Sequence, residues 1–209
     1  MALPVDICNL ALTKLGQPRI GSIDPPYINP YGVEPDCAFV YPLARDAELR
    51  KNPWSFARSR LILAADGNTP PFGTDDDEPD DQGSSWADEV PMDTPQIFQY
   101  RVPNDFIRMI KMKYEERRIE GQYVLTYEDS PINFQYIARV DPALFDPLFV
   151  EALACQVAVQ LTYKITTSDA LKQSIGQDYK LAINEAKRVN AIEAPPERAP
   201  EDTFVLVRR

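Results

Sequence analysis

Residues 139–154 read RVDPALFDPLFVEALA, and the apolar run that they begin continues as CQVAVQL to residue 161. Asp146 followed by Pro147 is typical of a helix start, because the carboxylate accepts hydrogen bonds from free backbone amides and proline suits the first helical position. Apolar residues then occupy almost every side of the predicted helix. Such a helix has to be enclosed by other parts of the protein, so the sequence predicts that it is central.

A second long helix is predicted directly after the first. Thr166, Thr167 and Ser168 interrupt the apolar pattern, and Ser168 is expected to cap a helix that ends near Glu193. The predicted core positions of the two helices are Phe149, Leu153, Val157, Leu161, Leu171, Ile175 and Tyr179.

Two more helices are predicted near the N-terminus. The first covers residues 4–15, and the second runs from about Pro35 to about Asn52. Pro42 falls inside the second helix and predicts either a kink or a later start. Residues 17–35, between the two helices, are rich in proline and predict a long ordered loop.

After residue 53 the spacing of the apolar residues changes from a helical pattern to a strand pattern. Short β-branched and aromatic runs separated by turn residues predict antiparallel strands, with a tight hairpin at Glu120-Gly121-Gln122. The predicted fold class is therefore α+β. An antiparallel four-helix bundle (residues 1–53 plus 141–194) carries an inserted small antiparallel β-sheet platform (54–140), followed by an extended C-terminal tail (195–209).

The composition argues against the common catalytic machinery. None of the 209 residues is histidine, so any mechanism that needs a Ser–His, Cys–His or His–metal pair is excluded for this chain alone. The widely spaced Cys8, Cys37 and Cys155 are expected to be small buried apolar residues. No glycine-rich phosphate loop is present. We therefore expect a non-enzymatic protein with no catalytic residue, cofactor or metal.

The charge is concentrated in one segment. Residues 66–95 contain ten acidic residues and no Lys or Arg, whereas the rest of the chain has 22 acidic and 22 basic residues. We predict a weakly ordered acidic loop here. An EF-hand starting at Asp75 would need glycine and an acid where Asp80 and Trp86 stand, so that template fails. The densest acidic residues are Asp75, Asp76, Asp77, Glu78, Asp80 and Asp81.

Two other functional classes stay open at this point. Lys111, Lys113, Arg117 and Arg118 suggest a nucleic-acid-binding module, although alternate strand residues face opposite sides and the charges do not all converge. A carboxylate-based metal hydrolase that uses residues 75–81 is a less favoured alternative.

The C-terminal residues TFVLVRR, 203–209, are too apolar for a solvated tail. Strand addition to a partner would satisfy their backbone and side chains together. The alternative is that the tail folds back on its own helices. The tail residues concerned are Phe204, Val205, Leu206, Val207, Arg208 and Arg209.

Several segments together resemble the tail tubular protein A family, the head-to-tail adaptors of short-tailed bacteriophages and prophages. They are ICNLALTKLGQPRIGSID, CAFVYPLARDAELRKNPWSFARSRLILA, VPNDFIRMI, EGQYVLTYED and YIARVDPALFDPLFVEALACQVAVQLTYKITTSDALKQSIGQDYKLAINEAK. The resemblance covers about residues 1–65 and 97–193, in the family's order. The acidic segment departs from it, because a shorter connection would be expected there.

The resemblance implies a structural role in a virion. Adaptors of this family form a ring of twelve subunits beneath the portal protein, continue the DNA channel and present a platform to the tail nozzle protein. The implied partners are the portal, the nozzle, further copies of the chain, and genomic DNA that passes without sequence recognition. The implied location is the head–tail junction of a virion made in the host cytoplasm. A membrane partner is not expected. The acidic loop would face the channel or the tail, and the C-terminal tail would hold the portal.

Overall fold

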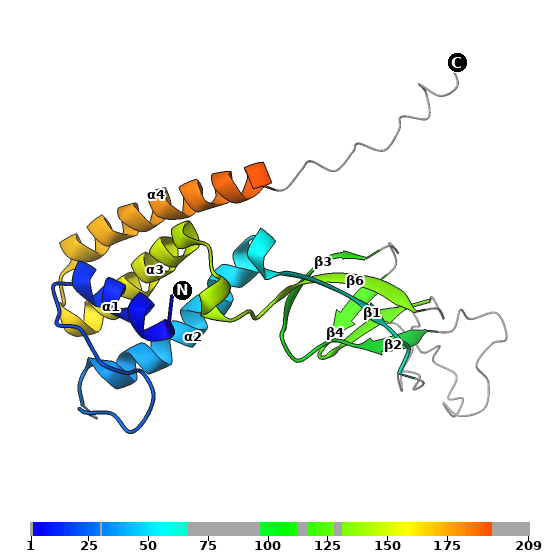
Figure 1. Cartoon of the computed structure of the whole chain (residues 1–209), viewed down its shortest axis with the longest axis horizontal. Helices are drawn as coiled ribbons and strands as arrows, with labels where there is room; N and C mark the ends of the chain where they lie inside the picture. The colour runs from blue at the N-terminus through cyan, green and yellow to red at the C-terminus, as the bar shows by residue number, and fades with distance from the viewer. Residues whose placement is uncertain (1, 30, 67–96, 113–116, 128–130, 194–209) are drawn as a thin grey trace, which may run out of the picture. The chain divides into compact units, whose positions relative to one another are not determined.

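The structure, a computed structural model, describes residues 2–29, 31–66, 97–112, 117–127 and 131–193. These residues form a mixed α+β protein with four α-helices and two small antiparallel sheets (Figure 1). The chain divides into two compact units. One contains the residues up to Ala57 and those from Arg139 onward, and the other is Arg58–Ala138.

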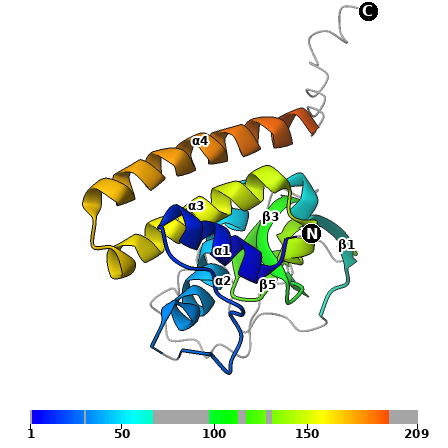
Figure 2. The ribbon, with the colours of Figure 1, turned by 60° about the vertical axis from the view of Figure 1, so that its left-hand side comes forward.

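The helical unit is organised around α3, Pro147–Ile165. It lies between α4, Asp169–Glu193, and the pair formed by α1, Pro4–Lys14, and α2, Val33–Lys51 (Figures 1 and 2). Its buried residues are Phe149, Ala152, Leu153, Ala154, Cys155, Val157, Ala158, Leu161 and Thr162. The prediction of a central apolar helix is confirmed.

The start of α3 is the one that the sequence predicts. Asp146 is the N-cap, and its Oδ1 accepts hydrogen bonds from the backbone amides of Leu148 at 2.8 Å and Phe149 at 3.4 Å. Pro147 occupies the first helical position. By length and hydropathy alone α3 could also cross a membrane, but the core helix of a globular unit meets the same criteria.

The predicted core of α4 is only partly buried. Ile175 is 3% exposed, whereas Leu171 and Tyr179 are half-buried. Ser168 caps α4 as predicted, with its Oγ accepting from the amide of Leu171. Thr167, just before this cap, has φ of 50°, a left-handed conformation that is strained for a β-branched residue.

Helix α2 begins earlier than predicted. It starts at Val33, before Pro35, because proline is tolerated in the first turn, where backbone amides have no helical partner. Pro42 lies inside the helix and does not mark its start.

Aromatic side chains close the core around the start of α3. Trp54 and Phe56 lie in or next to the short 3-10 helix η1, Ser55–Ala57, and Phe145 follows a second one, η2, Pro142–Leu144. The ring centroid of Phe149 lies 4.9 Å from that of Trp54 and 5.0 Å from those of Phe56 and Phe145.

The prediction of a single sheet is wrong, because the strands form two. One sheet has the order β1-β6-β3, built from Arg58–Leu63, Ile132–Ala138 and Phe106–Met112. The other has the order β2-β5-β4, built from Phe98–Arg101, Tyr123–Thr126 and Arg117–Glu120. The predicted hairpin joins β4 to β5, and Gly121 takes φ of 56°, which glycine adopts without steric cost.

The central position of α3 gives a stability prediction. Leu153 is fully buried, so Leu153→Ala is expected to lower the free energy of unfolding by about 2–5 kcal/mol through lost burial and a residual cavity. Chemical denaturation monitored by circular dichroism measures the change. Leu181→Ala on the exposed side of α4 is the matched control, and it should change stability by less than about 0.5 kcal/mol. Equal effects of the two changes would contradict the central placement of α3.

Candidate interaction surface

Helix α2 carries apolar side chains on two opposite sides. The side that faces the core holds Glu34, Cys37, Tyr41, Ala44, Glu48 and Leu49, all buried. On the opposite side lie Phe39, 71% exposed, and Leu43, 57% exposed, one turn apart. A helix that is apolar on both sides is typical of one that packs against two partners, and the described part of this chain covers only one side of α2.

Two more large apolar side chains are exposed in the loop that precedes α2 in the chain. Ile28 is 86% exposed and Tyr31 is 99% exposed, although both are large side chains that normally lose contact with water on folding. We call Ile28, Tyr31, Phe39 and Leu43 the α2 surface. Exposed aromatic and aliphatic side chains of this kind are the usual anchors of protein–protein contacts.

Hydrogen bonds from side chains hold this loop in place. The Asn9 amide of α1 donates to the carbonyl of Ile20 at 3.0 Å, and its Oδ1 accepts from the Ile20 amide at 2.8 Å. Glu34, 8% exposed, accepts from the amide of Asn29 at 3.1 Å. Asn29 in turn accepts from the Tyr31 amide. A loop ordered before binding loses less conformational entropy when a partner arrives.

A buried carboxylate joins α2 to α4. Glu48 is fully buried, and its oxygens accept hydrogen bonds from the Tyr179 hydroxyl at 2.9 and 3.1 Å and from the Lys51 ammonium at 2.5 Å. Burial raises the pKa of Tyr179, so the hydroxyl remains a donor. For Lys51, burial opposes the ammonium form, but the hydrogen bonds to Glu48 and Tyr179 give a net raised pKa. These hydrogen bonds satisfy the buried carboxylate of Glu48 and join α2 to α4, so we assign Glu48 a structural role.

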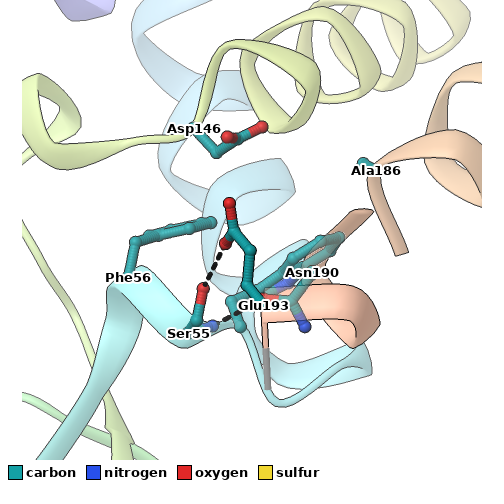
Figure 3. A pocket seen from close by; sticks show the side chains of 7 residues that line it. Ser55, Phe56, Asp146, Ala186, Asn190 and Glu193 are labelled. Carbon is teal, nitrogen blue, oxygen red and sulfur yellow. Dashed lines mark hydrogen bonds between the residues drawn. The ribbon is translucent and has the colours of Figure 1, made fainter. Parts of the chain in front are cut away.

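The end of α4 is fastened to η1 beside a small crevice (Figure 3). The amide of Ser55 donates to Asn190 Oδ1 at 2.7 Å, and the Ser55 hydroxyl donates to Glu193 at 3.3 Å. The cavity volume of the crevice is about 10 Å³, roughly the room that one water molecule needs, so the crevice is too small to be a ligand pocket. Asp146 on its rim already caps α3. We assign these residues to the anchoring of α4.

The three cysteines are buried and free, as the sequence predicts. A hydrogen bond between the Cys8 and Cys37 side chains, together with burial, raises the pKa of Cys8. Burial also raises the pKa of Cys155. The same hydrogen bond lowers the pKa of Cys37. With their raised pKa values, Cys8 and Cys155 behave as small, unreactive apolar residues of the core.

The other predicted sites fall largely beyond the described residues. The acidic residues 75–81 and the tail residues 204–209 lie outside them. Of the basic residues that suggested nucleic-acid binding, Lys111 belongs to β3 and Arg118 to β4, so these two lie in different sheets. Within the described ranges no group of three or more potential ligand side chains is placed to hold a metal ion.

The sequence did not reveal the α2 surface or the buried Glu48. Phe39 and Leu43 are one helical turn apart, but their spacing alone does not tell an exposed apolar side of a helix from a buried one. No family model matches the chain, and no curated protein matches it significantly.

The anchoring of the loop gives a prediction. Asn9→Ala removes both hydrogen bonds to Ile20 and is expected to lower the free energy of unfolding by about 1–2 kcal/mol and to speed amide exchange across residues 18–29. Hydrogen exchange with mass spectrometry measures it. Asn184→Ala, on an exposed position of α4, is the matched control and should leave the loop unchanged. Unaltered loop exchange in Asn9→Ala would show that other contacts order the loop.

Proposed function

We propose that this chain is a structural head-to-tail adaptor of a short-tailed phage or prophage virion. Copies of it assemble as a ring under the portal protein, continue the DNA channel and present a platform to the tail nozzle. In this proposal the four helices form the bundle of the adaptor, and the two sheets form its β platform.

The observation that carries the proposal is the α2 surface. Its four large apolar side chains are between 57% and 99% exposed, and the loop that holds two of them is held by the half-buried Asn9 and the buried Glu34. In a ring, one surface of each copy meets a different surface of the next copy, so an exposed apolar face on every subunit is covered. We propose that a second copy of this chain covers the α2 surface.

The resemblance supports the same function. Its segments correspond to α1 with the following loop, to α2 through β1, to the start of β3, to the β4–β5 hairpin, and to β6 through α4. The resembling stretches therefore lie almost wholly within the described elements of both units.

The remaining parts of the proposal concern segments outside the described residues. The tail residues Phe204–Arg209 add to the portal as a strand, with the two arginines reaching acidic groups. The acidic residues 75–81 face the channel or the tail partner, where negative charge keeps DNA phosphates from adhering.

The experiment replaces the exposed apolar residues with charged ones. A Phe39→Glu, Leu43→Glu variant is expected to fold normally, because both side chains are largely exposed, but to lose assembly by at least about tenfold in affinity, since charges at an interface core are poorly tolerated. Size-exclusion chromatography with light scattering, on the chain mixed with the portal protein of the same virion, measures ring formation.

Leu181→Glu on the exposed side of α4 is the matched control. It introduces the same charge on a 71% exposed leucine and is expected to assemble as the wild type does. If the double variant assembles fully, the α2 surface is not the contact between copies of the chain. A wild-type chain that never joins the portal would remove the adaptor function itself.

A further inference from the structure

The end of α4 lies beside the end of α2 in the helical unit. The last residue of α4, Glu193, accepts a hydrogen bond from the Ser55 hydroxyl at 3.3 Å (Figure 3). Asn190, one turn earlier, accepts from the Ser55 amide at 2.7 Å. α2 ends at Lys51, four residues before Ser55 in the chain. The residues that follow Glu193 therefore leave the helical unit next to the last turn of α2.

The chain after α4 is long enough to return along α2 to the α2 surface. From Asn52, just after α2, to Leu43 is about 14 Å along the helix axis, and crossing to the exposed side of the helix adds about 10 Å. Residues 194–203 span about 31 Å in an extended conformation. Three of these ten residues are proline, which favours extended backbone and cannot continue α4. Their length brings Phe204 within reach of Leu43.

The apolar residues at this point match the spacing of the α2 surface. On an extended strand, Phe204 and Leu206 project to the same side, about 7 Å apart. On α2, Leu43 and Phe39 are one turn apart, about 6 Å along the axis, and they are 57% and 71% exposed. A strand that runs antiparallel to α2 thus brings Phe204 to Leu43 and Leu206 to Phe39.

Before assembly, the chain's own tail is a better occupant of the α2 surface than a second copy. A segment tethered to its site acts at an effective concentration of about a millimolar, whereas free copies in dilute solution are far scarcer. Contact between the two apolar segments removes both from water, and this burial is favourable.

We propose that residues 203–207 cover the α2 surface of their own chain before assembly and prevent contact between copies. This inference rests on the proposed function, in which the C-terminal tail adds to the portal and a second copy covers the α2 surface. The tail cannot occupy both places at once. Capture of the tail by the portal therefore exposes the α2 surface, and the ring closes only on the portal.

The test is disulfide trapping in the free, full chain. Ala47 is exposed on α2 one turn after Leu43, and Asp202 precedes Phe204 by two residues. The docked tail brings these two positions together, and neither is an apolar anchor. An Ala47→Cys, Asp202→Cys variant is expected to form an intramolecular disulfide with oxidised glutathione, which takes up the two electrons and is reduced to two thiols. The native cysteines are buried and do not compete. Mass spectrometry of non-reduced peptides measures the rate.

An Asn184→Cys, Asp202→Cys variant is the matched control. Asn184 is exposed on α4 and much closer to Asp202 in the chain than Ala47 is, so random encounters favour the control. The Ala47 pair is nevertheless expected to react at least about tenfold faster. Adding Phe204→Glu with Leu206→Glu should abolish this advantage. Val205→Glu with Val207→Glu, on the other side of the strand, should keep most of it.

Equal rates in the two trapping variants would overturn the proposal, and so would a disulfide that joins two chains, because a second copy would then be the occupant. Portal protein is expected to slow trapping by about tenfold, since it withdraws the tail. Unchanged trapping in the portal-bound chain would overturn the release. Failure of the adaptor function is a different result, namely a wild-type chain that never joins the portal.

Discussion

The enclosure of α3 is the constraint on which the helical unit depends. A helix with buried residues on almost every side has to be surrounded, and the other three helices provide the surroundings. Asp146 fixes where the helix begins, and the ring of Phe149 packs against three further aromatic rings at that end. α1, α2 and α4 take positions that cover α3. Their outer surfaces do not face α3 and are available for other contacts.

The outer helices are secured by polar as well as apolar contacts. α4 buries only Ile175, Ile183 and Ala186, and the bonds of Tyr179 to Glu48 and of Asn190 to Ser55 fasten it beside α2. Removing one partner of a buried carboxylate typically costs about 3–5 kcal/mol, so Glu48 makes the placement of α4 specific. The loop before α2 is held by separate hydrogen bonds from Asn9 and Glu34, and the exposed Tyr31 and Phe39 lie on this anchored loop and on α2.

Short sequence motifs correctly predicted where helices and turns begin. They did not predict which distant strands pair with each other. The Asp146–Pro147 start of α3 and the Gly121 hairpin depend on a few neighbouring residues, and both are confirmed. The division of the strands into two sheets depends on β1 pairing with β6 across most of the second unit, which periodicity does not encode. Glu48 was missed because a carboxylate in a helix is normally solvated, and its partner Tyr179 is distant in sequence.

The central claim is that this chain acts as one subunit of a ring that joins a portal to a tail. Electron microscopy of the chain mixed with the portal protein of its own virion tests this claim most directly. The account predicts an added closed ring of density on the portal axis, with the helical unit of each copy contacting its neighbour through the α2 surface. Portal particles that remain bare at saturating concentrations of a folded chain would contradict the account.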